Sequence, residues 1–96
     1  MKQFIQDKYG HAIYLTDERW AHIVERHPVL KSHKEKVLSI VRSASRSRHE
    51  FEWNVFLYRK AFAEVSPLHT HIEVAVIFDT KLGQPNNFIV TAYPTS

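Results

Sequence analysis

The spacing of the apolar residues changes once along this chain, and that change limits the folds open to it. Between residues 16 and 44, apolar side chains recur at intervals of three and four, as on one face of a helix. From residue 46 onward they recur at intervals of two, as in half-buried strands. Helices followed by consecutive strands predict an α+β fold, with two helices packed on one face of an antiparallel sheet of about four strands.

The ends of the two helices are marked by specific residues. Thr16 is a good N-cap for the first helix, because its hydroxyl can accept a bond from a free backbone N–H of the first turn. Pro28 disfavours helical geometry at the residue before it, so this helix should end near there. Ser32 followed by Glu35 is a capping-box pattern for the second helix. A glycine-ended turn at 7–10, between two β-prone runs, predicts a short N-terminal hairpin.

The second half of the chain predicts a series of strands and a core. Strands are expected at 46–48, 55–59, 70–78 and 88–93, with a turn at 81–86. Along the last strand, simple alternation places Phe88, Val90 and Ala92 on one face and Ile89, Thr91 and Tyr93 on the other. The residues expected to be buried together are Trp20, Ile23, Val37, Val41, Val74, Val76 and Val90.

The composition excludes several classes of protein. Ninety-six residues suit a single domain, and the absence of cysteine excludes disulfides, cysteine–zinc sites and thiol nucleophiles. Two glycines cannot build a glycine-rich phosphate loop. The longest apolar run, 74–78, is far too short to span a bilayer, and no N-terminal run resembles a signal peptide. A cytoplasmic protein without a membrane partner is therefore expected.

The charge balance gives a first indication of function. Thirteen Lys and Arg against ten Asp and Glu give a net charge of +3, with a pI near 9.3. A positive balance favours polyanionic partners such as RNA. An equally good interpretation is that this charge only keeps the protein soluble.

The first helix carries the first candidates for chemistry. His22 and Arg26 are four residues apart, so they share one helix face, and the cation should leave His22 freer to accept a proton. The alternative is an exposed histidine paired with Glu18. His27 lies partly on the packed face, and its alternative role is to cap the helix end, where an imidazolium meets the negative end of the dipole.

The strands carry the remaining candidates. Arg46 and Arg48 point to the same side if extended, and two guanidiniums make a good phosphate clamp; a solvated basic loop is the alternative. Tyr58 and Arg59 are neighbours and must face opposite ways. Thr91 interrupts an apolar strand that ends at Tyr93.

A metal site is a further alternative. His69, His71 and Glu73 alternate, so they project from one face of a strand, and imidazoles with a carboxylate can hold zinc. The apolar residues between them have the opposite parity, which favours a solvated face for all three.

Two segments resemble a known family. Residues 15–28 (LTDERWAHIVERHP) and 88–93 (FIVTAY), with a strand that carries Tyr58 and Arg59 between them, resemble a phage-associated nuclease-like family grouped with the barnase, EndoU, colicin and RelE ribonucleases. The resemblance covers residues 11–95, so it implies a single nuclease-like domain over residues 1–96. It also implies helices packed on an antiparallel sheet.

The resemblance further implies a metal-independent, toxin-like endoribonuclease without a cofactor, and an antitoxin or immunity protein as a possible partner. In such an enzyme a base takes the proton from the ribose 2′-OH, which attacks the phosphate, and an acid protonates the leaving oxygen. His22 or His27 would be acid or base, with Thr91 and Arg48 at the phosphate. The expected substrate-binding residues are Arg26, Arg46, Tyr58, Arg59 and Tyr93. A catalytically silent RNA- or protein-binding domain of the same fold is the alternative, and convergence of His22, Arg48 and Thr91 in one cleft would favour the enzyme.

Overall fold

Helices and strands occupy separate parts of the chain in the computed structural model, which describes residues 1–62 and 66–96 in full and residues 63–65 by their backbone alone. The elements, in order, are β1 (Lys2–Gln6), β2 (Ala12–Thr16), α1 (Asp17–Arg26), the 3-10 helix η1 (Pro28–Leu30), α2 (Lys34–Ser43), β3 (Arg46–Arg48), β4 (Val55–Ser66), β5 (His69–Ile77), β6 (Thr80–Lys81), β7 (Gln84–Pro85) and β8 (Asn87–Thr95). The α+β class is confirmed, and so is the N-terminal hairpin β1–β2.

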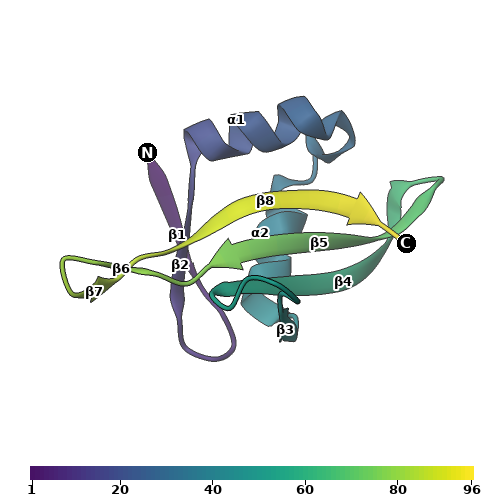
Figure 1. Ribbon diagram of the computed structural model, residues 1–96. Helices are drawn as coiled ribbons and strands as arrows, with labels where there is room; N and C mark the ends of the chain where they lie inside the picture. Colours follow the sequence, from purple (N-terminus) through teal and green to yellow (C-terminus); the bar gives the residue numbers. More distant parts are fainter.

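The helices and the sheet form two layers (Figure 1). The main sheet has six strands in the order β1-β2-β8-β5-β4-β3. In the ribbon, α1 runs along β8 and α2 lies behind the sheet, where it packs against β1, β4 and β5. No helix in the described part of the chain covers the opposite face, which is turned toward the viewer and which we call the open face.

The sheet differs from the prediction, because it has six strands rather than four and is mixed rather than antiparallel. The N-terminal hairpin joins the main sheet at β8, where Ile13 pairs with Asn87 and Tyr14 with Phe88 in parallel. This docking buries Ile13 completely against the helices. Parallel neighbours need a long connection, and the whole chain between β2 and β8 supplies it.

The first helix begins as predicted, whereas the second does not. The Thr16 hydroxyl accepts a bond from the Arg19 backbone N–H at 3.0 Å, which confirms the N-cap. Ser32 is not a cap, since α2 begins one residue later and its N-cap, His33, makes no side-chain capping bond. The physical reason is η1, whose turns continue until the His33 N–H bonds to the Leu30 carbonyl at 2.9 Å.

The core lies between the helices and the sheet, and most of the predicted core is confirmed. The five predicted residues that are completely buried are Ile23, Val37, Val41, Val74 and Val76. Trp20 is only half-buried at the margin of this core. Val90 is not a core residue, because β8 contains a bulge there.

The bulge resets the faces of the last strand. Thr91 pairs with Ala75, but the next pair is Ile89 with Val76, so Val90 has no partner. Ile89 and Ala92 therefore both point into the core. The alternation predicted for Phe88, Ile89 and Val90 is wrong for this reason. Phe88, which pairs with Ile77, lies on the face away from the core. Thr91 and Tyr93 keep their predicted place on that face.

The predicted turn at 81–86 is a separate small hairpin. Strands β6 and β7 pair through Lys81 and Gln84, and the two residues between them have positive φ angles, 52° for Leu82 and 77° for Gly83. This is the backbone of a two-residue hairpin turn, in which glycine is favoured. None of the described helices is long and apolar enough to cross a membrane.

Candidate functional site

The open face of the sheet is hollowed over its middle strands. Strand alternation sends Leu57, Ala75 and Ile77 away from the helices, and they form part of the floor of a hollow of about 300 Å³. The polar residues that line it are His49, Glu52, Thr91 and Tyr93. An apolar floor with a few polar groups at the margin is a common form of ligand site.

Beside this hollow, three side chains form what we call the open-face row: Tyr93, Glu73 and Arg59. They come from β8, β5 and β4, and the strand register pairs Tyr93 with Glu73 and Glu73 with Arg59. Directly opposed residues in antiparallel strands have their Cβ atoms about 5 Å apart. The row therefore places a carboxylate between a phenol and a guanidinium.

The phenol of the row is held in its protonated form. Burial raises the pKa of Tyr93, and the nearby charge of Glu73 raises it further, against a smaller lowering by Arg59. Tyr93 is thus suited to donate a hydrogen bond rather than to act as a base.

His27 lies at the margin of the same row. It is the C-cap of α1, where its backbone N–H bonds to the Ile23 carbonyl at 2.8 Å, so the helix ends where Pro28 predicted. Because α1 packs against β8, the imidazole reaches the Tyr93 ring, with 6.2 Å between the two ring centres. A histidine therefore lies beside the phenol of the row.

His49 reaches the hollow from the loop between β3 and β4. Its Nδ1 accepts bonds from the backbone N–H groups of Phe51 at 3.1 Å and Glu52 at 3.2 Å. We therefore assign the proton of its neutral ring to Nε2, which makes the ring a hydrogen-bond donor. The same loop exposes two large aromatic side chains, Phe51 and Trp53, to solvent.

Arg59 is the exposed cation of this face. Its guanidinium donates a hydrogen bond to the backbone oxygen of Ser96. A planar guanidinium binds phosphate oxygens through two parallel bonds, so a phosphate at this position would replace the Ser96 oxygen. Glu73 can accept a proton and the neighbouring His27 can donate one, so the row and this histidine together offer a base, an acid and a cation that can bind phosphate.

The predicted site residues fall into separate groups, and four of them come together: His27, Arg59, Thr91 and Tyr93 border the open face. His22 does not, since it is exposed on α1 in another hollow with Glu18 and Arg19. Arg26 is exposed at the end of the same helix.

Arg48 also lies away from the open face. It pairs with Phe56 in the β3–β4 register, and its guanidinium lies 5.6 Å from the centre of that ring. Phe56 packs against the core, so Arg48 is on the helix side at the margin of the sheet. The three residues expected to converge, His22, Arg48 and Thr91, are therefore not brought together.

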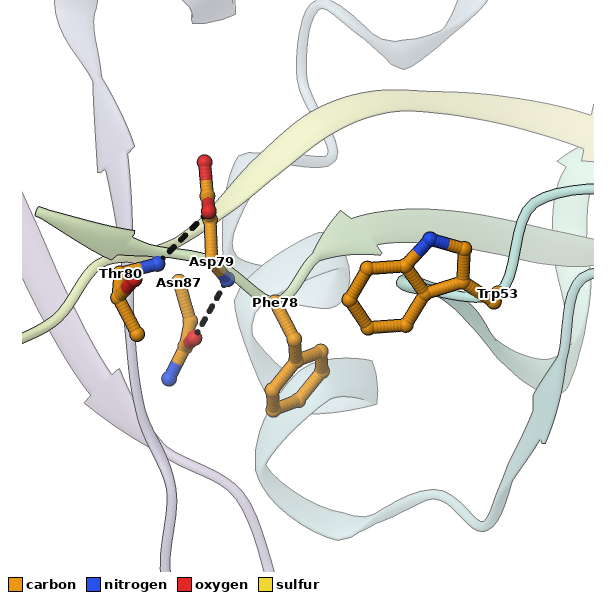
Figure 2. A pocket seen from close by; sticks show the side chains of 5 residues that line it. All are labelled: Trp53, Phe78, Asp79, Thr80 and Asn87. Atoms are coloured by element: carbon orange, nitrogen blue, oxygen red, sulfur yellow. Dashed lines mark hydrogen bonds between the residues drawn. The ribbon is translucent and has the colours of Figure 1, made fainter.

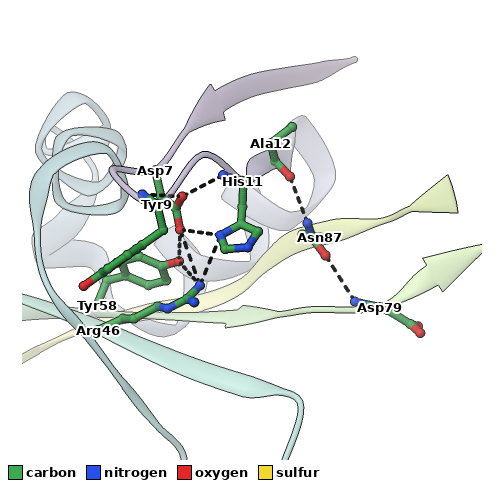
Figure 3. Close-up of polar contacts among 8 residues, drawn as sticks. All are labelled: Asp7, Tyr9, His11, Ala12, Arg46, Tyr58, Asp79 and Asn87. Atoms are coloured by element: carbon green, nitrogen blue, oxygen red, sulfur yellow. Dashed lines mark hydrogen bonds and ion pairs between the residues drawn. The ribbon is translucent and has the colours of Figure 1, made fainter.

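Arg46 and Tyr58 belong to a different group, the buried cluster of Asp7, His11, Arg46 and Tyr58 (Figure 3). The Tyr58 hydroxyl donates to Asp7 Oδ2 at 2.6 Å, and Arg46 Nη1 lies 3.5 Å from the same oxygen. The His11 ring nitrogen Nδ1 is 3.3 Å from it. Asp7 Oδ1 accepts the backbone N–H groups of Tyr9 and His11.

The buried cluster is satisfied within the protein. Arg46 is enclosed by the rings of Tyr9, Phe56 and Phe78, at 4.4 to 5.0 Å from their centres. Burial alone would raise the pKa of Asp7, but bonds from the Tyr58 hydroxyl and from His11 outweigh it and hold the pKa below its ordinary value. Arg46 is therefore not free to form the predicted clamp with Arg48, and the cluster fastens the hairpin to the sheet.

A second hollow, of about 280 Å³, lies at the end of β5 (Figure 2). Trp53 and Phe78 line it together with Asp79, Thr80 and Asn87. The Asn87 amide oxygen accepts the Asp79 N–H, and its amide nitrogen donates to the Ala12 carbonyl, both at 3.2 Å (Figure 3). These polar groups join β5, β8 and the hairpin, so we assign this hollow to the packing of the fold.

The metal alternative gains no support from the described residues, among which no three His, Asp or Glu side chains are grouped to hold a metal ion. The His69 ring bonds to the Ser66 hydroxyl at 2.8 Å, and the His71 ring to that of Thr70 at 2.7 Å. Glu73, the third residue of that set, faces Tyr93 in the open-face row.

Three contributors were not predicted in these roles. Glu73 was assigned to the metal alternative, although its parity on β5 already placed it on the face opposite Ile72 and Val74. His49 gave no sequence signal, since its role depends on a loop. Asp7 was interpreted only as a turn residue.

The chain was also compared with known proteins. No known protein family, curated protein or solved structure matches it.

Proposed function

We propose that this protein is a metal-independent endoribonuclease that acts on the open face of its sheet. The observation that carries the proposal is the open-face row, in which the register places Glu73 between Tyr93 and Arg59. The net charge of +3 favours a polyanionic substrate, and cytoplasmic RNA is the substrate we assign.

Two residues of the site carry the proton transfers of the reaction. Glu73 takes the proton from the ribose 2′-OH, and the 2′-oxygen then forms a bond to the adjacent phosphorus. The bond from phosphorus to the 5′-oxygen breaks, and His27 gives that oxygen a proton. The products are a 2′,3′-cyclic phosphate and a free 5′-hydroxyl.

The remaining side chains hold the phosphate. Arg59 balances the negative charge that develops on its oxygens, and Thr91 and Tyr93 donate hydrogen bonds to it. These roles replace those expected for His22, Arg46 and Arg48, because His22 and Arg48 lie elsewhere and Arg46 is occupied by Asp7.

Two histidines of one helix segment provide the test. Total RNA is incubated with the protein in the presence of a chelator, and the ends of the fragments are identified. We expect His27→Ala to lower cleavage by on the order of 100-fold. His22→Ala, in the exposed hollow on α1, is the matched control and should cut at the wild-type rate.

Two results would contradict this proposal. One is the absence of defined fragments with 2′,3′-cyclic phosphate ends. The other is loss of activity in His22→Ala while His27→Ala remains fully active, which would place the reaction on the outer face of α1.

The second candidate function is a catalytically silent RNA-binding domain that uses the same open face. The separation of His22, Arg48 and Thr91 favours it. Such a protein would retain RNA through Arg59 without cutting it. An antitoxin or immunity protein, if the chain is a toxin, would have to cover this face in either case.

A further inference from the structure

Three aromatic rings cross the N-terminal hairpin and the start of β8, and we call them the aromatic ladder: Phe4, Tyr14 and Phe88. The register pairs Phe4 with Tyr14 and Tyr14 with Phe88. The ring centres are 5.5 Å and 5.8 Å apart. The next residues along the hairpin strands, Ile5 and Ile13, are buried, so the ladder lies on the face away from the core.

The ladder has an exposed end at Phe4, and a lysine lies beside it. The Phe4 side chain is 63% exposed and is continuous with the other two rings of the ladder, and a contiguous apolar surface of this kind marks an interaction site. The Lys2 ammonium lies 4.3 Å from the centre of the Tyr14 ring. Among the described residues, no carboxylate is within ion-pair distance of Lys2. The Tyr14 hydroxyl donates to the Asn86 amide oxygen at 3.0 Å, which fixes its ring.

The ladder is continuous with the candidate site. Phe88 pairs with Ile77 of β5, and Ile77 forms part of the floor of the open-face hollow. A single-stranded RNA that crosses this face would therefore meet the ladder on one side of the hollow and the open-face row on the other.

We propose that the aromatic ladder binds unpaired bases of the RNA beside the cut site, while Lys2 contacts the phosphates. This inference rests on the proposed function, since it names single-stranded RNA as the substrate class. Aromatic rings stack on any base with an open face, whereas a duplex keeps its bases stacked on each other. An apolar partner fits less well, because it would bury the Lys2 ammonium without a countercharge.

The test measures binding separately from cleavage. The probe is a short, labelled, single-stranded 2′-O-methyl RNA, which 2′-OH attack cannot cut, and affinity is read by fluorescence anisotropy. We expect Phe4→Ala to weaken binding by about 10-fold and Phe4→Trp to preserve it. The matched control is Leu82→Ala, which truncates another highly exposed apolar side chain, at the turn of the β6–β7 hairpin and outside the ladder; its affinity should equal that of the wild type.

Lys2 provides a second readout. Lys2→Ala should reduce the slope of log affinity against log salt by about 0.7, the value for one phosphate contact on a single strand. On a dinucleotide substrate, which is too short to reach the ladder, Phe4→Ala should cut at the wild-type rate, while kcat/KM for a long single strand falls.

The outcomes separate this inference from the proposed function. Binding that depends on Phe4 without any cleavage supports the ladder and overturns the ribonuclease. Cleavage of RNA, with the same RNA affinity in the wild type and in Phe4→Ala, supports the ribonuclease and overturns the ladder. A wild-type dimer that Phe4→Ala dissociates, with unchanged RNA affinity, overturns the inference and makes the ladder a contact between two copies. No RNA binding at all overturns both.

Discussion

The buried cluster, and the open-face row together with the histidine beside it, contain the same four kinds of side chain. Each has a carboxylate, an arginine, a tyrosine and a neighbouring histidine: Asp7, Arg46, Tyr58 and His11 in one, Glu73, Arg59, Tyr93 and His27 in the other. They lie on opposite sides of the sheet, since Tyr58 is completely buried against the helices and its neighbour Arg59 is exposed.

Their surroundings give them different capacities. In the buried cluster, the Asp7 side chain is 0% exposed and both of its oxygens accept bonds from the protein, so no position remains for a ligand. In the open-face row, the carboxylate is half-buried beside a hollow and the arginine is exposed. Residue type alone therefore does not identify a site; the groups must also have bonding capacity that faces solvent.

The two carboxylates should give the largest contrast in stability. Asp7→Asn leaves the enclosed Arg46 without its countercharge, and breaking a buried pair in this way costs about 3 kcal/mol or more of unfolding free energy. Glu73→Gln, on the half-buried open face, should change it by no more than about 0.5 kcal/mol. Urea unfolding of both variants measures the difference, and equal losses would mean that both groups are structural.

The two arginines should differ in the property that changes. Arg59→Lys should lower RNA cleavage by about 10-fold, since a point charge does not reproduce the planar fork on phosphate. Arg46→Lys should lose about 1 kcal/mol of stability, because the guanidinium is stacked among three rings. Cleavage assays at equal folded protein concentration test the first variant and urea unfolding tests the second. A cleavage defect confined to Arg46→Lys would reverse the assignment.

The two tyrosines give a smaller contrast. Tyr58→Phe removes a 2.6 Å bond to a buried carboxylate, which contributes about 1.5 kcal/mol or more. Tyr93→Phe should leave stability within about 0.5 kcal/mol and reduce cleavage modestly. Thermal unfolding of the two variants is the measurement. A destabilised Tyr93→Phe would show that the Tyr93 hydroxyl is bonded within the protein rather than available to a ligand.

The buried cluster should make the stability of the fold depend on pH. The pKa of Asp7 is lowered in the fold, so its contribution is complete above its ordinary value of 3.8 and is lost as the pH falls through the lower folded value. The pKa of Tyr58 is raised, so its contribution is complete at neutral pH and is lost only in strong base. The gap in Tm between wild type and Asp7→Asn should therefore narrow below pH 4. A constant gap would show that Asp7 is not held in its charged form.

Much of the fold could be predicted because its signals are local. The Thr16 cap, the hairpin turn at 7–10 and the alternation through β5 depend on neighbouring residues. The parallel pairing of β2 with β8 and the bulge at Val90 are set by packing between distant segments, and no glycine or proline marks the bulge.

The candidate site also combines features that local sequence predicts with features that depend on contacts between distant segments. Parity alone placed Tyr58 and Arg59 on opposite faces, and the resemblance selected Tyr93 and Thr91. Which carboxylate meets Arg59 depends on the register among β4, β5 and β8, and a shift of one residue would have turned Glu73 into the core. From the sequence, Asp7 is interpreted as an ordinary turn residue. Its role in the buried cluster depends on Arg46 and Tyr58, which only the fold brings close to it.

The most direct test of the central claim compares the two carboxylates in one cleavage assay. Single-turnover rates on a single-stranded RNA are measured for Glu73→Gln and Asp7→Asn in the presence of a chelator, each corrected for the fraction of folded protein. If the open-face row is the active site, Glu73→Gln should cut at least about 100-fold more slowly than the wild type, while folded Asp7→Asn should cut at the wild-type rate. Full activity in Glu73→Gln, or loss of activity in folded Asp7→Asn, would contradict it.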